Sequence, residues 1–518
     1  MANICLCLTG KTLAQNLEII EKYRKYIDMA ELRVDCLESD ERLLIRRFPE
    51  QAGLPVILTI RRKIDGGFYD SGEAGRITLI SKGLAFAEID KRHNFAYVDL
   101  EEDLEVPGLE EAVRTFGTRI IRSSHNLEGV GDITRKIRSL YKMGDEIAKV
   151  AVTPHNISDV LAIYRSAKET SSKKKILVGM GPYGANTRIL AEYLGSFLTY
   201  TSALEEQDLT PAAPGQMSPR QMAEQYRFKE ISAATEIYGI VGFPLKATFS
   251  PHIFNTVFTH EKINAIYVPF PADNLSNFLE LAAELGIKGA SVTIPYKEAI
   301  LPYLHTRSDS VEAAGACNTI KAVPQKTEDS PRKKNPKCFW HGINTDTLGF
   351  SESLLHFTGR KNFRSCMITI LGAGGAARAV AAEIHRLKGK CLILNRNPVR
   401  ARELAQSYGY KWGSMDRQSL DIMEKYSNII IQATPVGTFP NVDDDPFELY
   451  HFNGYETVVD LIYNPPMTAF LKRAQAAGCS VLNGFDMLIR QAKYQYQCFF
   501  GRDFPEQLIP RLKKTLQS

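Results

Sequence analysis

Short apolar runs separated by segments of helical spacing recur from Asn3 to Ala203. Between the runs, apolar residues return at helical intervals, for example at Leu13, Leu17 and Ile20. Eight strand and helix units in about two hundred residues predict a (β/α)₈ barrel near the lower end of its size range, and an open doubly wound sheet is the alternative. The eight runs are ICLCLTG, MAELRVDCL, PVILTIRR, FAYVDLEE, TRIIRSSHN, IAKVAVTPH, KKILVGMGP and FLTYTSA.

The second half contains one segment, from Ile368 to Arg396, with the pattern of a strand, a glycine turn, a helix and a second strand. The glycines are Gly372, Gly374 and Gly375, and Ala377 stands where the pattern accepts Gly or Ala for close helix packing. Such a turn lets the backbone approach a pyrophosphate at a helix N-terminus, so the segment predicts a dinucleotide site. One face of its helix is expected to carry Ala376, Val380, Ile384 and Leu387.

The end of the second strand of this unit favours NADP over NAD. An NAD site usually has Asp or Glu there, whereas this chain has Asn395, Arg396, Asn397 and then Arg400. Two guanidinium groups suit a 2′-phosphate, although either arginine could equally be a solvated surface residue.

Composition narrows the class of protein. The 518 residues are enough for two or three domains, and a net charge of +5 over this length does not indicate nucleic-acid binding. Nine scattered cysteines without CxxC pairs suit a reducing compartment. The N-terminus enters an apolar strand at once, and no apolar run approaches membrane-spanning length. We expect a cytosolic protein without membrane attachment, and no metal site is expected.

A barrel places its chemistry at the C-terminal ends of its strands. Several cations there imply an anionic substrate, most simply a carboxylate, and a solvated rim of unrelated charges is the alternative. The residues at these ends are Glu31, Arg33, Asp35, Arg61, Arg62, Asp65, His125, Lys149, Met180 and, just beyond, Arg188.

Lys149 lies within the apolar run IAKVAV and should point into the barrel. Desolvation and neighbouring guanidinium groups would lower its pKa and leave some neutral amine able to form a Schiff base with a ketone. His125, one strand earlier, is the residue best suited to move protons near neutral pH, although a lone strand histidine is more often structural.

The strand ends belong to the motifs ELRVD (31–35), TIRR (59–62), SSHN (123–126), IAKVAV (147–152) and MGPYGANTR (180–188), and APGQ (213–216) follows them. Together these motifs resemble the type I 3-dehydroquinate dehydratase family over nearly all of the first 225 residues. The resemblance implies that Lys149 is the Schiff-base lysine and His125 the general acid and base. It implies a substrate-binding set of Glu31, Arg33, Arg61, Arg188 and Gln216. Asp65 stands where Glu is usual, and Ala212 replaces a serine in the lid segment before APGQ.

A new strand after Ala234 places a domain boundary near residues 228–236. A charged segment, residues 325–337, is most simply a mobile hairpin loop, with a basic anion-binding loop as the alternative. Lys297 follows one strand closely, and Asp346 follows another. Such a pair could pass a proton to a substrate oxygen, or it could be an ordinary surface ion pair.

The second half contains the motifs PLKATFSP (244–251), VTIPYKE (292–298), GACNT (315–319), NTD (344–346), GAGGAAR (372–378), NRN (395–397), YNP (463–465) and NGFDML (483–488). In order and spacing they resemble the shikimate dehydrogenase family over about residues 236–510. The resemblance implies Lys297 and Asp346 as the catalytic pair. It implies a shikimate-binding set of Thr248, Ser250, Thr293, Asn318, Tyr463 and Gln491. It implies that NADP(H) is held by Gly372, Ala373, Gly374, Gly375, Ala376, Asn395, Arg396, Arg400, Thr434 and Gly484.

Two departures from the dehydrogenase pattern affect selectivity. Thr248 replaces the first serine of an SxS pair, and Gln432 replaces a usual asparagine. Thr248 keeps a hydroxyl but adds a methyl near the substrate, so quinate remains an alternative to shikimate.

The whole chain therefore resembles bifunctional dehydroquinate dehydratase/shikimate dehydrogenases, with 3-dehydroquinate and 3-dehydroshikimate as expected substrates. We expect an α/β protein with a (β/α)₈ barrel at 1–228 and a two-lobed dehydrogenase at 236–518. Its substrate lobe should span about 236–345 plus 484–518, and its Rossmann-like NADP lobe about 346–483. A non-catalytic metabolite sensor is the alternative of a different class, and the sequence leaves the oligomeric state open.

Overall fold

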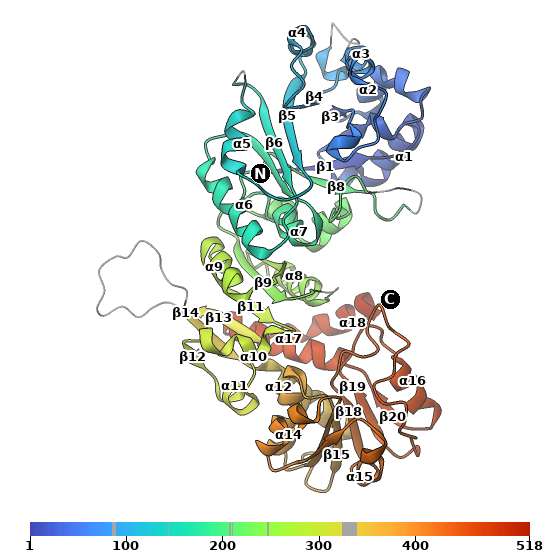
Figure 1. The fold of residues 1–518 in the computed structure, drawn as a ribbon, viewed down its shortest axis with the longest axis vertical. Helices are drawn as coiled ribbons and strands as arrows, with labels where there is room; N and C mark the ends of the chain where they lie inside the picture. The colour runs from blue at the N-terminus through green and yellow to red at the C-terminus, as the bar shows by residue number, and fades with distance from the viewer. Residues whose placement is uncertain are drawn as a thin grey trace, which may run out of the picture. The chain divides into compact units, whose positions relative to one another are not determined.

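A computed structural model describes residues 1–84, 90–142, 144–206, 209, 211–245, 248–323 and 339–517 (Figure 1). The chain divides into two compact units, Met1–Ile237 with Lys262–Gly286, and Tyr238–Glu261 with Ile287–Ser518. The charged segment predicted as a hairpin loop, residues 325–337, lies outside the described residues. The predicted domain limits stay a prediction.

The first unit contains a nearly closed barrel of eight parallel strands. Its strand order is β7-β6-β5-β4-β3-β2-β1-β8, and the bridge between Lys175 and Ser196 brings β7 beside the start of β8. The barrel predicted from the eight apolar runs is therefore confirmed, and the open sheet is not. The strands are β1 (Asn3–Leu8), β2 (Met29–Arg33), β3 (Val56–Thr59), β4 (Tyr97–Glu101), β5 (Arg119–Asn126), β6 (Ile147–Val152), β7 (Lys175–Gly179) and β8 (Leu198–Ser202).

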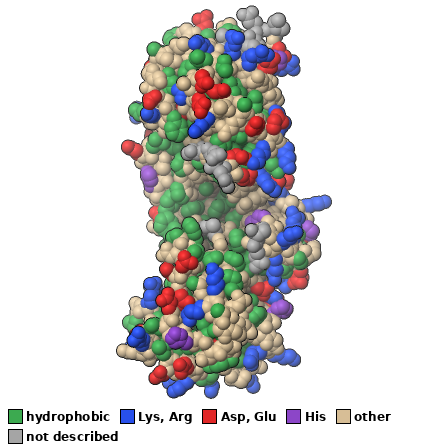
Figure 2. All heavy atoms as spheres, turned by 90° about the vertical axis from the view of Figure 1, so that its right-hand side faces the viewer, with side chains coloured by type: hydrophobic (Ala, Val, Ile, Leu, Met, Phe, Trp, Pro, Cys, Tyr) green, Lys and Arg blue, Asp and Glu red, His purple; other side chains and the backbone are tan. Residues whose placement is uncertain are grey.

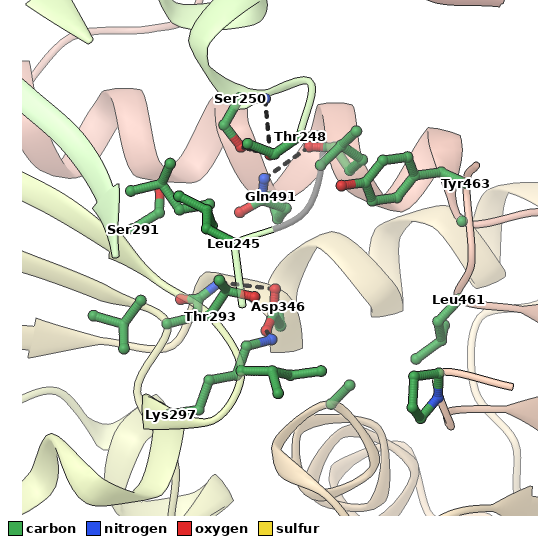
Figure 3. A pocket seen from close by; sticks show the side chains of 18 of the residues that line it. Leu245, Thr248, Ser250, Ser291, Thr293, Lys297, Asp346, Leu461, Tyr463 and Gln491 are labelled. Carbon is green, nitrogen blue, oxygen red and sulfur yellow. Dashed lines mark hydrogen bonds and ion pairs between the residues drawn. The ribbon is translucent and has the colours of Figure 1, made fainter. Parts of the chain in front are cut away.

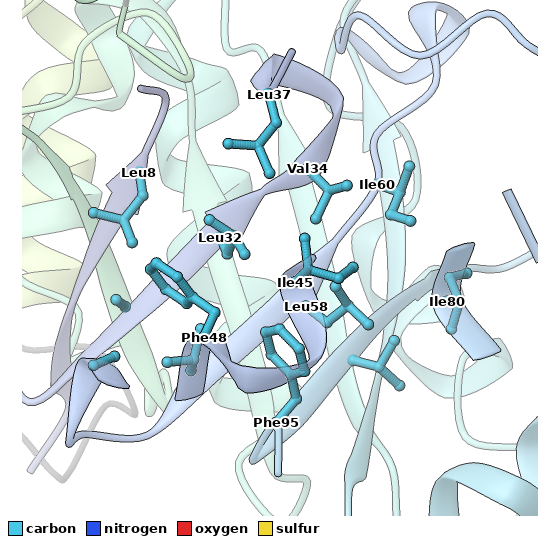
Figure 4. Packing of buried hydrophobic residues seen from close by; sticks show 14 of the residues in the cluster. Leu8, Leu32, Val34, Leu37, Ile45, Phe48, Leu58, Ile60, Ile80 and Phe95 are labelled. Carbon is cyan, nitrogen blue, oxygen red and sulfur yellow. The ribbon is translucent and has the colours of Figure 1, made fainter. Parts of the chain in front are cut away.

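Helices follow most of these strands and cover the barrel. They are α1 (Leu13–Tyr23), α2 (Phe48–Ala52), α3 (Glu73–Leu84), α4 (Pro107–Thr115), α5 (Ile133–Ser139), α6 (Ile157–Glu169) and α7 (Gly181–Ile189). Figure 4 shows Phe48 and Ile45 within one packed cluster with the strand residues Leu32 and Leu58. Burying such side chains contributes about 1.5–3 kcal/mol each, so this layer holds the strand ends in place.

A second, mixed sheet of six strands has the order β10-β9-β11-β13-β14-β12. Its strands are β9 (Glu236–Gly242), β10 (Ala265–Pro271), β11 (Gly289–Val292), β12 (Thr306–Arg307), β13 (Thr319–Val323) and β14 (Phe339–Ile343). The helices between them are α8 (Ser250–His260), α9 (Leu275–Leu285), α10 (Tyr296–Ala299) and α11 (Asp309–Ala314).

The predicted dinucleotide segment lies in a third sheet, which is entirely parallel. Its order, β17-β16-β15-β18-β19-β20, reverses direction at β15, the first strand, as in doubly wound nucleotide-binding sheets. The strands are β15 (Met367–Leu371), β16 (Lys390–Asn395), β17 (Lys411–Ser414), β18 (Ile429–Gln432), β19 (Thr457–Asp460) and β20 (Ser480–Leu482). The helices of this part of the chain are α12 (Thr345–Thr358), α13 (Gly375–Arg386), α14 (Pro398–Gln406), α15 (Leu420–Lys425), α16 (Ala469–Ala476), α17 (Phe485–Phe500) and α18 (Ile509–Gln517).

The buried face of α13 differs from the predicted one at its first residue. Ala377, Val380, Ala381 and Ile384 are fully buried, whereas Ala376 is only partly buried and lines a cavity. Both residues lie in the first turn of the helix, where Ala376 points to the cavity and its neighbour Ala377 points to the core.

One face of the molecule is mixed in charge. Figure 2 shows basic and acidic side chains interspersed over the visible face. Among the helices that the structure describes, none combines the length and the apolar character needed to cross a bilayer.

Candidate active sites

A cavity of about 300 Å³ opens at the C-terminal ends of the barrel strands. All seven residues that the sequence predicts for the dehydratase site line it: Glu31, Arg33, Arg61, His125, Lys149, Arg188 and Gln216. Cys7 and Tyr200 also line it, and sequence reasoning did not single them out. The alternation of inward and outward residues along β1 and β8 was the signal that could have found them.

Lys149 lies in the middle of β6 and its ammonium group is held by carboxylates. Nζ donates to Asp99 Oδ2 at 2.7 Å and lies 3.5 Å from Glu31 Oε1. Burial alone would raise the pKa of Asp99, but the neighbouring charges of Arg61 and Lys149 hold that pKa well below its usual range. The prediction that Lys149 points into the barrel is confirmed; its nearest charged partners are carboxylates rather than the expected guanidinium groups.

His125 lies one layer further along the barrel than Lys149. In the pairing of β5 with β6, Ser123 faces Lys149 and His125 faces Ala151. Burial, followed by the charges of Arg61 and Lys149, lowers the pKa of His125 well below its ordinary value. Nδ1 lies 3.5 Å from Arg61 Nη1, which can only donate, so a neutral His125 carries its proton on Nε2.

Two of the predicted cations are already paired. Arg61 lies 2.8 Å from Asp99 and 2.6 Å from Glu101, and Arg33 forms two bonds to Asp35 at 2.7 and 3.0 Å. The predicted cations Arg33, Arg61, Lys149 and Arg188 do meet at one cavity, but acidic residues on the same or neighbouring strands already neutralise Arg33 and Arg61. Arg62, also predicted at the mouth, pairs with Asp65 and Asp103 and does not line the cavity.

Arg188 is the exception among the arginines of this cavity. The residue is 2% exposed, and among the described residues its guanidinium has only two contacts, both long at 3.4 Å, to the carbonyl oxygens of Tyr200 and Pro214. Its Nε has no hydrogen-bond partner within the described part of the chain. Burial lowers the pKa of Arg188 to about 10. A buried guanidinium without a carboxylate is a strong candidate for binding an anionic ligand.

The segment 212–216 covers one side of this cavity. Gln216 Oε1 accepts from the backbone N–H of Ala213 at 3.2 Å, and its Nε2 lies 3.4 Å from Cys7 Sγ. Gly215 has a φ of +78°, and a Cβ there would lie 2.7 Å from the carbonyl oxygen of Gly181. The backbone can therefore close over the barrel only with glycine here. Ala212 places a methyl group at the cavity wall.

A second cavity, of about 380 Å³, lies in the second unit (Figure 3). Figure 3 shows Lys297, from α10, pointing toward Asp346 in the first turn of α12, with Nζ 2.6 Å from Oδ2. Asn318 donates to the other carboxylate oxygen at 2.8 Å. The two side chains are 15% and 9% exposed, so the pair is not an ordinary surface ion pair.

Asp346 is positioned by the cap of its helix. Asn344 precedes α12, and its Oδ1 accepts from the backbone N–H of Asp346 at 3.1 Å and of Thr347 at 3.3 Å. Its Nδ2 donates to the carbonyl oxygen of Ala316 at 2.8 Å. Because both ends of the amide are used, the start of α12 is tied to the strand that follows Ala316.

The six residues predicted to bind the shikimate ring all line this cavity: Thr248, Ser250, Thr293, Asn318, Tyr463 and Gln491. Thr248 Oγ1 lies 3.3 Å from Ser250 Oγ, so the threonine keeps a hydroxyl pair at this end. Two further polar residues, Ser291 and Gln495, were missed; Ser291 Oγ donates to Gln495 Oε1 at 3.0 Å. Gln495 lies one helical turn after Gln491, and this i, i+4 spacing was the available signal.

The glycine turn brings the predicted nucleotide site against the second cavity. Gly372 has a φ of +114°, and α13 begins at Gly374 and Gly375 without a side-chain cap, which leaves its first N–H groups for an anion. A Cβ on Gly375 would lie 3.0 Å from the side chain of Lys297. Ala376 and Gly484 line the cavity, and Ala373 is buried beneath the turn. These features fit the binding of a dinucleotide at this turn.

The other end of the site carries two exposed arginines. Asn395 Nδ2 donates to the carbonyl oxygen of Asn397 at 2.9 Å, which shapes the turn after β16. Arg396 and Arg400 are exposed and form no ion pair with any residue that the structure describes. On the far side of the turn, Thr434 contacts the position of a Gly372 Cβ, and the buried Gln432 accepts from the backbone N–H of Thr434 at 2.7 Å.

Comparison with known proteins matches both halves of the chain. Family models match residues 4–233 (type I 3-dehydroquinase), 240–320 (shikimate dehydrogenase substrate binding domain) and 356–442 (shikimate / quinate 5-dehydrogenase). The "Shikimate dehydrogenase (NADP(+))" of Methanocaldococcus jannaschii is 35% identical over 279 residues, which are 52% of this chain and 93% of that protein.

The chain belongs to the shikimate dehydrogenase family. It carries a type I 3-dehydroquinase domain in front of the dehydrogenase. The "Bifunctional 3-dehydroquinate dehydratase/shikimate dehydrogenase, chloroplastic" of Arabidopsis thaliana is 28% identical over 501 residues, covering 93% of this chain and 79% of that protein.

Solved structures include a shikimate dehydrogenase from Aquifex aeolicus, with a TM-score of 0.47 and 31% identity over 54% of this chain and 98% of that one. They also include the dehydroquinate dehydratase and shikimate dehydrogenase of S. pombe AroM, with a TM-score of 0.41 and 22% identity over 99% and 98% of the two chains.

Proposed function

We propose that this chain performs two consecutive steps of the shikimate pathway. The barrel dehydrates 3-dehydroquinate to 3-dehydroshikimate, and the second unit reduces 3-dehydroshikimate to shikimate with NADPH. The observation that carries the proposal is that each cavity holds one lysine with a carboxylate partner, Lys149 with Asp99 and Lys297 with Asp346. The two lysines lie in different compact units, so we assign one step to each.

In the barrel, the unpaired Arg188 supplies the binding site for the substrate carboxylate. The amine of Lys149, after losing a proton, attacks the C3 ketone, and the carbonyl oxygen leaves as water to give an iminium. The positive nitrogen acidifies the C2 proton, which neutral His125 takes. His125 returns a proton to the C1 hydroxyl, which leaves as water, and hydrolysis of the imine releases the enone and restores Lys149.

In the second unit, the ammonium group of Lys297 donates a hydrogen bond to the ketone oxygen and then a proton as the alcohol forms. Asp346 holds that ammonium group in place, and Asn318 fixes the second carboxylate oxygen. Thr248, Ser250, Tyr463 and Gln491 surround the ring and orient it. Bound NADPH supplies the hydride.

The cofactor would be held at both ends by this chain's own groups. The N-terminus of α13 would bind the pyrophosphate, and Arg396 and Arg400 would offer guanidinium groups to the 2′-phosphate. Gly375 permits the close approach of the turn to Lys297. The cytosolic location stays a prediction that rests on the scattered cysteines.

One assay tests the two-step proposal and both alternatives. With 3-dehydroquinate and NADPH, enone absorbance should rise first and NADPH absorbance should fall after it, while quinate with NADP⁺ should give little turnover. Binding of 3-dehydroquinate without any change in either absorbance would support the sensor and contradict the proposal. Faster oxidation of quinate than of shikimate would assign the second unit to quinate instead.

A further inference from the structure

Tyr200, on β8, lines the barrel cavity beside Lys149. Its side chain is 5% exposed and belongs to the apolar cluster of the barrel interior, with Cys5, Ile147 and Val178 among its members. The Nζ atom of Lys149 lies over the face of this ring, 4.5 Å from the ring centroid. At this distance the face of a tyrosine attracts a cation.

The hydroxyl group of Tyr200 is buried and has no hydrogen-bond partner in the described part of the chain. Buried hydroxyl groups normally find a partner, and leaving one without costs stability. A phenylalanine would fill the same space without this cost. The unpaired hydroxyl therefore lowers the stability of the ligand-free protein, as expected for a group whose hydrogen-bond partner is a bound ligand.

The other polar groups of the cavity support this interpretation. Glu31 accepts from Thr59 at 2.9 Å, Asp99 accepts from Lys149, and Arg33 and Arg61 are bound to carboxylates. Among the described residues that line this cavity, only Arg188 and Tyr200 have a buried side-chain polar atom without a partner. Both atoms can donate, so together they suit a ligand rich in oxygen atoms with one carboxylate.

We propose that Tyr200 is a further substrate-binding residue of the barrel cavity, whose hydroxyl donates a hydrogen bond to an oxygen of the bound polyhydroxylated ketone. Its ring faces the positive charge on the Lys149 nitrogen, first as the ammonium and then as the iminium formed when the ketone oxygen leaves as water. The proposal rests on the proposed Schiff-base function of Lys149.

Tyr200→Phe tests the hydroxyl, since it keeps the ring. We expect KM for 3-dehydroquinate to rise about 5- to 10-fold, the value of one hydrogen bond, while Tm stays the same or rises because an unpaired hydroxyl is removed. Tyr496→Phe is the matched control: Tyr496, on α17, also has a buried hydroxyl without a partner among the described residues, but it lies outside both cavities. It should give the same change in Tm and no change in KM.

An unchanged KM in Tyr200→Phe would overturn the hydroxyl contact. So would a raised KM together with a clear fall in Tm, because that result would assign the hydroxyl to the fold. Tyr200→Leu tests the ring: with saturating substrate and borohydride, the amount of adduct trapped on Lys149 should fall several-fold, while the NADPH-dependent reduction of 3-dehydroshikimate is unchanged. Trapping at the wild-type rate would overturn the ring's role.

Different results would contradict the Schiff-base function of Lys149 and the substrate-binding role of Tyr200. If the wild-type protein gives no adduct on Lys149, the Schiff-base function is wrong and the role of Tyr200 falls with it. If the wild-type protein gives the adduct and both Tyr200 variants match it in KM and trapping, only the inference about Tyr200 is wrong.

Discussion

Arg396 gives the clearest single-residue test of the choice between NADPH and NADH. Replacing Arg396 with Ala removes a planar donor that suits a phosphate, so NADPH binding should weaken by about 10- to 150-fold, or about 1.5–3 kcal/mol, while NADH binding changes little. Cofactor titration of the two proteins measures the difference. Arg364 is an exposed arginine just before the start of β15, whereas Arg396 follows the end of the parallel strand β16. Arg364→Ala is therefore the control and should leave NADPH affinity unchanged. Equal losses for NADPH and NADH would instead assign Arg396 a structural role.

The lowered pKa of His125 predicts an unusual pH dependence of the dehydration reaction in the barrel. Because burial, Arg61 and Lys149 lower its pKa, the imidazole stays neutral, and able to take a proton, well below pH 6.5. We expect kcat/KM for dehydration to show no loss attributable to His125 between pH 8 and about pH 6. A decline with a midpoint near pH 6.5 would contradict the lowered pKa.

The same lowered pKa affects stability in a defined direction. The unfolded chain binds a proton at His125 below about pH 6.5 and the folded chain does not, so this residue makes the fold less stable as pH falls through that range. His125→Gln should remove that part of the pH dependence, and thermal unfolding at several pH values would measure it.

Helix α12 shows how one element positions a reactive side chain. Asn344→Ala removes the side-chain acceptor for the N–H groups of Asp346 and Thr347, together with the bond to Ala316. We expect a loss of about 1–2 kcal/mol in the free energy of unfolding and a fall in kcat for reduction, with dehydration unchanged. Asn344→Asp keeps the cap acceptor but not the amide donor, and should be milder on both measures. Unchanged reduction in the alanine variant would show that the cap does not position Asp346.

The elements that could be predicted from sequence are those defined by neighbouring residues. The strand runs of the barrel and the glycine turn at 372–375 were predicted correctly because apolar periodicity and glycine spacing are local signals. The pairing of Lys149 with Asp99 was not predicted, since it joins residues 50 positions apart and depends on the register of β4, β5 and β6. Ser291 and Gln495, 204 positions apart, were missed for the same reason.

At the scale of the whole molecule, the two cavities belong to separate compact units. A tether alone does not retain a small metabolite, which diffuses away quickly. We therefore predict free release of the intermediate: an excess of a Lys297→Ala, Asp346→Asn double variant should supply 3-dehydroshikimate to a separate Lys149→Ala protein and restore shikimate formation. If each half-reaction works alone but the mixture makes no shikimate, the intermediate does not escape.

The central claim is that one chain carries two reactions, each with its own lysine. The most direct measurement follows NADPH oxidation by Lys149→Ala, supplied first with 3-dehydroquinate and then with 3-dehydroshikimate, beside Lys297→Ala under the same conditions. The account predicts that Lys149→Ala oxidises NADPH only with 3-dehydroshikimate, and that Lys297→Ala forms the enone from 3-dehydroquinate but reduces it far more slowly than the wild-type protein. NADPH oxidation by Lys149→Ala at the wild-type rate with 3-dehydroquinate would contradict the account.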